Sequence, residues 1–140
     1  MADYLFRNID ILDTKPSTGV GIKIPFDGAT GINTTFTTKD AIKSNLLNFL
    51  LTGKRERVLN PGFGSGLREL IFQPLTDTLR AQMEDLVLSG VNQFFPNVRI
   101  NSLNVDLDPD NSKTILNINY SVINTNIDDD IQINVNNGGV

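Results

Sequence analysis

The chain has 140 residues, enough for one domain with its own hydrophobic core. It contains no cysteine and no histidine, which excludes disulfides, thiolate or imidazole metal sites, and the usual Ser-His-Asp and Cys-His catalytic centres. A formal net charge of −4 argues against nucleic-acid binding, and no apolar run is long enough to span a membrane. The N-terminus also lacks the plan of a signal peptide, so we expect a soluble, cytosolic protein.

Residues 1–35 have an irregular pattern, with Gly, Pro, Thr and Asp scattered among short apolar groups. We expect an extended N-terminal arm that depends on other surfaces for its order. Within it, residues 21–26 alternate between apolar and other residues up to Pro25, which predicts a short edge strand.

A helix is predicted over about residues 38–52. Thr37 or Thr38 can cap its first turn, and Asp40 lies where the helix dipole favours an anion. Gly53 marks its end. Apolar residues recur at helical spacing along this segment, namely Ala41, Ile42, Leu46, Phe49 and Leu50.

The next segment, residues 53–66, predicts a loop with one fixed shape, because glycines and a proline are interleaved with apolar residues. We expect hydrophobic anchors at Val58, Leu59, Phe63 and Leu67. Basic residues are also frequent here, and we expect them to pair with carboxylates or loop carbonyls, or with a partner's carboxylates; they are Lys54, Arg55, Arg57 and Arg68.

Two further helices are predicted. Leu67, Leu70 and Ile71 share one helix face in a short helix that ends before Pro74. Thr76 or Asp77 can then cap a helix over about residues 77–94, which Pro96 ends. Its inward stripe comprises Leu79, Met83, Leu86, Val87, Gly90, Val91 and Phe94.

The rest of the chain changes to a period of two, which predicts three strands joined by short turns. The apolar positions are Leu103, Val105 and Leu107, then Leu116, Ile118, Tyr120 and Val122, then Ile131, Ile133 and Val135. We therefore predict an α+β fold, in which an antiparallel three- to four-stranded sheet is packed by two main helices. The domain spans residues 36–136, and residues 137–140 form a flexible tail.

Acidic residues give little support for a reactive site. Asp106, Asp108 and Asp110 resemble the start of a calcium loop, but Asn111 replaces its glycine and Asn117 its bidentate glutamate. The run Asp128–Asp130 is typical of a solvated turn. We expect no metal, cofactor or small-molecule substrate.

Several segments together resemble one family. They are Gly21–Phe26, the helix start Asp40–Leu46, the loop motif Glu56–Gly64 with Leu67, and the stretch Leu70–Pro74, followed by the C-terminal strands. This ordered set is similar to the small baseplate wedge proteins of contractile-tailed phages, which are related to a baseplate subunit of type VI secretion systems. The resemblance covers about residues 20–136.

The resemblance implies a non-enzymatic structural role in a virion tail baseplate that is assembled in the host cytoplasm. The implied partners are other baseplate wedge proteins and tail sheath subunits, with tube or hub proteins as further candidates. The C-terminal half resembles the domain through which sheath subunits share strands, so we expect Ile131, Ile133 and Val135 to lie in a strand shared with sheath.

The resemblance also implies site residues. The family's Glu-Pro-Arg signature, which contacts the core helical bundle of the wedge, corresponds here to the stretch Phe95–Arg99. The proline is kept as Pro96, Phe95 replaces the glutamate, and the nearest arginine is Arg99. We expect Pro96, Arg99 and Arg57 to bind the wedge core. The residues expected to fix the loop are Glu56, Pro61, Phe63 and Gly64.

Two other functions remain open at this level. One is a peptidoglycan-cleaving, lysozyme-like tail enzyme, which needs two opposed carboxylates. The only glutamates are Glu56, Glu69 and Glu84. Glu56 lies between two arginines, which we expect to lower its pKa and so make it a poor proton donor. The other is a small regulatory adaptor on the same fold that forms a one-to-one complex with a soluble partner.

Overall fold

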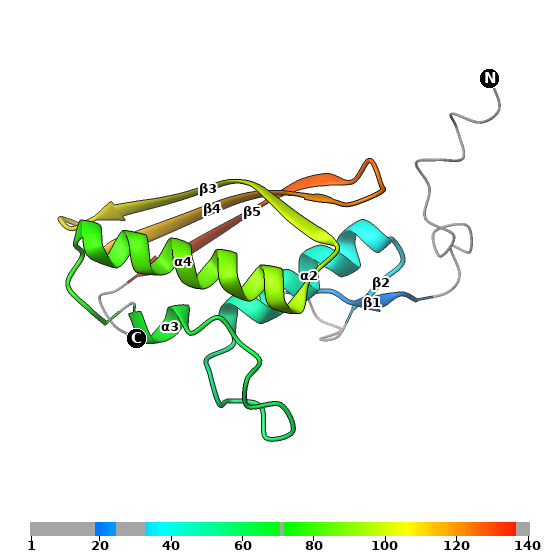
Figure 1. The fold of residues 1–140 in the computed structure, drawn as a ribbon, viewed down its shortest axis with the longest axis horizontal. Coiled ribbons are helices and arrows are strands. Elements are labelled where there is room, and N and C mark those ends of the chain that lie inside the picture. Colours follow the sequence, from blue (N-terminus) through cyan, green and yellow to red (C-terminus); the bar gives the residue numbers. More distant parts are fainter. Residues whose placement is uncertain (1–18, 25–32, 71, 137–140) are drawn as a thin grey trace.

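The computed structural model describes residues 19–24, 33–70 and 72–136. In these ranges, helices cover one face of an antiparallel sheet (Figure 1). The predicted α+β fold is confirmed, with a three-stranded main sheet. Most of the expected arm, residues 1–18 and 25–32, and the expected tail, residues 137–140, lie outside the described residues.

The first described element pair is a small ribbon. Strand β1 (Gly21–Ile22) pairs antiparallel with β2 (Thr34–Thr35) in a two-stranded sheet of its own. The edge strand predicted over residues 21–26 therefore forms at residues 21–22, but it does not join the main sheet; residues 25 and 26 lie outside the described residues. The ribbon lies against the first described helix, because the backbone N–H of Ile24 donates to Ser44 Oγ at 3.2 Å and Thr35 is buried.

Helix α2 (Thr38–Leu51) confirms the first predicted helix. Thr37 caps it by accepting a hydrogen bond from the backbone N–H of Asp40 and donating one from its hydroxyl to the Asp40 carboxylate. The helix ends because Thr52 turns extended, with φ −84° and ψ 127°. Gly53 follows this cap as expected, but its φ is not positive, so the stop does not depend on the left-handed conformation that glycine favours.

Helices α3 (Leu67–Leu70) and α4 (Asp77–Phe94) also lie where they were predicted, although Ile71, expected in the short helix, lies outside the described residues. Thr76 caps α4, since its hydroxyl accepts a hydrogen bond from the backbone N–H of Leu79 at 3.3 Å. Gly90 lets α4 approach α2 closely, because a Cβ there would lie 2.9 Å from Phe49 Cε1. A side chain at this position would displace the fully buried Phe49 ring.

The main sheet is a meander of β3 (Val98–Asp108), β4 (Lys113–Val122) and β5 (Asp128–Asn136), with β4 in the centre. A bulge between Ile100 and Ser102 shifts the register of β3 against β4. Helix α4 packs mainly on β3, whereas α2 reaches β5. The sheet contributes its inward residues to one continuous core, made of Val98, Val105, Leu116, Ile118, Tyr120, Val122, Ile131 and Ile133.

The opposite face of the sheet is polar. One cross-strand row joins Asn104, Asn117 and Gln132. In a neighbouring part of this face, Asn101 donates to Asn119 at 3.1 Å and accepts from the hydroxyl of Ser121 at 3.2 Å. The sheet therefore follows the alternation of a half-buried structure, with one face in the core and the other open to solvent.

Candidate functional site

Strand β5 is an edge of the main sheet. It pairs with β4 on one side only, and no second strand borders it among the described residues. Ile131 and Ile133 are 2% and 8% exposed, so their side chains belong to the core rather than to the surface. An incoming chain could therefore contact β5 through its backbone, which is the usual mode of strand addition.

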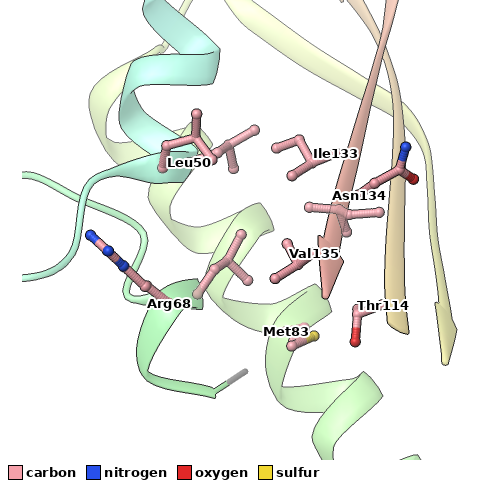
Figure 2. A pocket seen from close by; sticks show the side chains of 10 residues that line it. Leu50, Arg68, Met83, Thr114, Ile133, Asn134 and Val135 are labelled. Carbon is pink, nitrogen blue, oxygen red and sulfur yellow. The ribbon is translucent and has the colours of Figure 1, made fainter. Parts of the chain in front are cut away.

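A pocket of about 420 Å³ lies beside the end of β5 (Figure 2). Its walls come from β4, β5 and helices α2, α3 and α4, and most of its lining is apolar. The lining residues are Leu50, Leu51, Leu67, Arg68, Met83, Thr114, Leu116, Ile133, Asn134 and Val135. In Figure 2 the Arg68 guanidinium points away from Ile133 and Val135, which leaves the apolar part of the pocket next to the strand.

The loop of residues 53–66 is tied to the end of α2 through Ser65, which is 1% exposed. The Ser65 backbone N–H donates to the carbonyls of Phe49 and Thr52, both at 3.2 Å, and its hydroxyl donates to the Leu50 carbonyl at 2.7 Å. The same hydroxyl accepts from the backbone N–H of Leu67. Sequence reasoning missed this residue, and its only signal was its position between two glycines.

Each of the four residues predicted to fix the loop makes a contact within the loop or at its base. The Gly53 N–H donates to Glu56 Oε2 at 2.9 Å, and Arg68 pairs with Glu56 Oε1 at 3.4 Å. The Pro61 carbonyl accepts from the Arg55 N–H at 3.0 Å. Gly64 has φ +125°, and a Cβ there would lie 2.6 Å from the Gly53 carbonyl oxygen. Only glycine fits this position without strain.

Phe63, the fourth of these residues, joins the loop to an aromatic cluster. Its ring lies edge-on to Phe49 and to Phe94, with centroids 5.4 Å apart in both pairs. Phe95 also packs edge-on against Phe49, at 5.6 Å. The Arg57 guanidinium carbon lies 3.9 Å from the Phe63 ring centroid, a cation–π contact. The cluster thus connects the loop to the end of α4.

The expectation that Val58 and Leu59 anchor the loop is wrong. Their side chains are 94% and 99% exposed, and the loop leaves the body on the helix side, away from the sheet (Figure 1). Of the four expected anchors, Leu67 is buried and Phe63 is partly buried against the core. The loop is held at its base, and its apolar tip has no contact surface in the described part of its own chain.

Pro96 and Arg99, two residues expected to bind a partner, are both exposed. Pro96 lies in the turn between α4 and β3, where it lines a hollow with Phe94, Phe95 and residues of the β4–β5 turn. Arg99 follows buried Val98 in β3 and lies opposite Ser121 of β4 in the strand register, so its side chain lies on the polar face of the sheet. Arg57 is also exposed, and it packs on the ring of Phe63 within the 53–66 loop.

The run Asp128–Asp130 is not a solvated turn, because it forms the start of β5. Asp129 is only 13% exposed and meets Lys39 at 3.6 Å and Lys43 at 3.3 Å. Burial raises the pKa of Asp129. The hydrogen bond from the Asp130 N–H and the charges of Lys43 and Lys39 lower the pKa by more than burial raises it, so the net pKa shift is downward. The spacing of the two lysines, one helical turn apart, was the missed signal.

Tyr120 is fully buried, and within the described ranges its hydroxyl has no hydrogen-bond partner. Burial raises the pKa of this phenol, and the nearby Asp129 carboxylate raises it further. The group is therefore neutral at physiological pH. A buried unpaired hydroxyl lowers stability, and nothing in its surroundings gives it a reaction to perform.

The described residues contain no group of three His, Cys, Asp or Glu side chains placed to hold a metal ion. No helix in these same ranges is long and apolar enough to cross a membrane. Of the glutamates considered for hydrolysis, Glu56 has both carboxylate oxygens engaged at the loop base. Glu56 therefore serves as a structural carboxylate at the base of the loop.

Solved structures with the same fold are known. One is described as a putative tail lysozyme from Geobacter sulfurreducens; it has 21% sequence identity and a TM-score of 0.62, over 71% of this chain and 91% of that one. Another, from the baseplate of the anti-feeding prophage, has 18% identity and a TM-score of 0.57 over 92% of each chain. At these identities the likeness supports the fold alone.

Sequence comparison is more specific. Baseplate wedge protein gp25 of Enterobacteria phage T4 is 35% identical over 95 residues, which are 66% of this chain and 70% of that protein. The family model described as "Baseplate wedge protein gp25" matches residues 37–127, from the cap of α2 to the turn before β5. The chain therefore belongs to the gp25 family of baseplate wedge proteins.

Proposed function

We propose that this structural baseplate protein starts sheath assembly by accepting a strand of a sheath subunit at the open edge of β5. The same proposal places it in the virion tail, after assembly in the host cytoplasm, beside other wedge proteins. The observation that carries the proposal is the geometry of β5. Its inward side chains complete the core, while one long side of its backbone has no neighbouring strand within the described ranges.

The pocket beside β5 would let this edge select among incoming strands by their side chains. A strand added along β5 would direct every second side chain toward the helices, on the same side as Ile133 and Val135. The pocket lies on that side and is lined by Leu50, Leu51 and Met83 among others. We therefore expect the added strand to place one large aliphatic side chain there, next to Val135.

Energetics explain why such a contact would act only in an assembly. Five or six added backbone hydrogen bonds contribute about 3–8 kcal/mol in total, at about 0.5–1.5 kcal/mol each. Association costs about 4–15 kcal/mol, so a single shared strand is marginal between free proteins. Holding several copies in a ring raises the effective concentration to about millimolar and makes the same contact stable.

We further propose that Pro96, Arg99 and Arg57 contact other proteins of the wedge. All three are exposed, and Pro96 and Arg57 are linked through the aromatic cluster around Phe63 and Phe94. Arg99 lies on the polar face of the sheet, so it would contact a different part of the same partner, or another one. Tube and hub proteins remain further candidate partners, and we propose no small-molecule ligand and no catalytic step.

The experiment is sheath growth on preformed baseplates that carry variants of either sheet edge. The pair Gln132→Lys and Asn134→Lys places two charges on β5, which should prevent strand addition. Asn104→Lys and Asp106→Lys change the matching rows on β3, at the other edge. We expect the β5 variant to reduce sheathed tails at least ten-fold, while the β3 variant leaves them unchanged.

Equal sheath growth on both variants, at unchanged melting temperature, would contradict the assignment to β5. Deletion of the strand itself is not a usable test, because Ile131 and Ile133 belong to the core and their loss would unfold the domain. The enzyme alternative has a separate test. Clearing of purified cell walls by the wild-type chain, abolished in Glu84→Gln, would contradict a purely structural role.

A further inference from the structure

The tip of the 53–66 loop presents the most exposed apolar side chains in the described part of the molecule. Val58 and Leu59 are adjacent in sequence and are 94% and 99% exposed, whereas the other large exposed apolar residues, such as Phe72 at 80%, stand singly. Two neighbouring aliphatic side chains held fully in water lower the solubility of a protein. Such a feature is typical of a surface that is covered by another molecule.

The tip is carried on a rigid base. Ser65 makes hydrogen bonds to the end of α2, Phe63 packs in the aromatic cluster, and Gly64 lies against the Gly53 carbonyl. The Arg55 N–H closes the neck of the loop on the Pro61 carbonyl. Because the base is already ordered, binding at the tip would lose little conformational freedom. The geometry is therefore that of a preformed projection.

The tip is also flanked by positive charge, in a chain whose net charge is −4. Lys54, Arg55 and Arg57 have no ion pair with a carboxylate of the described residues, and Glu56 is already engaged by Arg68 and the Gly53 N–H. A surface that is complementary to this loop would thus combine an apolar centre with carboxylates at its rim.

We infer that Val58 and Leu59 form a two-residue plug that inserts into an apolar pocket with an acidic rim on another protein of the baseplate. This inference rests on the baseplate role and adds a docking surface separate from the β5 edge. The plug supplies buried apolar area, and Arg55 and Arg57 pair with the carboxylates of the rim. The partner is defined by this chemistry.

A second copy of this chain fits poorly as the occupant. The apolar pocket beside β5 has no carboxylate among its described lining residues, so it lacks the acidic rim that would pair with the basic flanks of the plug. A lipid surface is the other chemistry that takes aliphatic and basic residues together. The rigid base and the small size of the tip favour a shaped protein pocket, and the experiment below separates these occupants.

The absence of cysteine makes a direct test possible, because Leu59→Cys gives the full chain a single thiol. We would compare maleimide labelling of this thiol in the free protein and in purified assembled baseplates. We expect labelling at least ten-fold slower in the baseplate. Labelling at the free rate in a baseplate that contains the chain overturns the plug but leaves the baseplate role intact. Absence of the chain from the particle would instead contradict the proposed function.

A competition for incorporation tests the chemistry of the tip. We expect Val58→Ser with Leu59→Ser to enter baseplates at least ten-fold less well than wild type, at an unchanged melting temperature. Phe72→Ser, which removes an isolated exposed apolar residue, is the matched control and should incorporate normally. An equal deficit in both variants overturns the assignment to the tip.

Two measurements on the free chain address the other occupants. Flotation with vesicles of phosphatidylglycerol and phosphatidylethanolamine should show no binding; binding that the tip variant abolishes would overturn the inference in favour of a membrane. Sedimentation should show a monomer; a dimer that the tip variant dissolves would identify a second copy as the occupant and also overturn it.

Discussion

The β5 edge offers its backbone to a partner, whereas the 53–66 loop offers its side chains. In β5 the side chains of Ile131 and Ile133 are buried in the core, and the backbone of the open edge is available for hydrogen bonds. In the loop the backbone is held by internal hydrogen bonds around Ser65 and Pro61, and the side chains of Val58 and Leu59 are available. A backbone edge accepts many sequences, whereas a side-chain plug requires a matching pocket.

This difference suggests a division of labour. We propose that the edge makes a repeated contact with sheath subunits, each of which presents an extended segment. The plug suits a single fixed position in the wedge. Both depend on one framework, because the loop base and the pocket beside β5 meet at the end of α2, where Leu50 lines the pocket and its carbonyl accepts from Ser65.

The largest expected effect is the loss of the loop base in Gly64→Ala. The new Cβ would lie 2.6 Å from the Gly53 carbonyl oxygen and 2.7 Å from that of Thr52, at φ +125°. We expect destabilisation by about 3 kcal/mol, from strain and steric overlap together. Gly62→Ala is the control, since its Cβ would meet only Asn60 Oδ1 at 3.9 Å. Urea unfolding of the two variants measures the contrast, and similar midpoints would disprove the strain at Gly64.

A gain in stability is expected on the sheet side of the comparison. Tyr120→Phe removes a buried hydroxyl that has no partner in the described ranges, which should stabilise the domain by about 1 kcal/mol. Because the folded state raises the pKa of this phenol, wild-type stability should fall as pH rises above about 10, the unfolded pKa. The variant should lack this alkaline loss. Thermal melts between pH 8 and pH 11 measure both effects, and a destabilised variant would show that the hydroxyl has a partner.

The smallest expected effect concerns the attachment of β5 to α2. The folded state lowers the pKa of Asp129, so its ion pairs with Lys39 and Lys43 stabilise the fold above about pH 4 and are lost as the pH falls through the lower folded value. Asp129→Asn should cost about 0.5 kcal/mol at pH 7 and reduce the loss of stability on acidification. Urea unfolding at pH 7 and pH 3 checks this, with the exposed Asp128→Asn as control. Equal effects of the two variants would remove the special role of Asp129.

Local signals made much of the fold predictable from sequence. A threonine directly before an apolar helical pattern predicts an N-cap, because its hydroxyl can accept a hydrogen bond from a free backbone N–H of the first turn. Thr37 and Thr76 cap α2 and α4 in this way. The alternation from Leu103 to Val135 gives the meander, because each strand needs one buried face. The residues of β1 were identified as a strand, but its partner β2 was not. Their pairing joins residues that are more than ten positions apart, and local sequence patterns do not reveal such contacts.

The site was less predictable, because exposure depends on what lies opposite a side chain. Val58 and Leu59 are apolar and were assigned to the interior, yet their own chain provides no surface for them in the described ranges. Asp129 belongs to an acidic run typical of a turn, but lysines almost 90 residues earlier in the chain neutralise it. Gly64 and Phe63 were identified by their motif, and the contacts that explain them appear only in the folded structure.

The most direct test of the division between edge and plug is a side-chain-resolution cryo-EM map of an assembled baseplate with its first ring of sheath. We predict that the backbone of a sheath subunit runs beside β5 over residues 130–136, with one aliphatic side chain near Val135, and that another protein covers Val58 and Leu59. A map in which the β5 edge faces solvent, or is bordered only by this chain's own residues, would contradict this prediction.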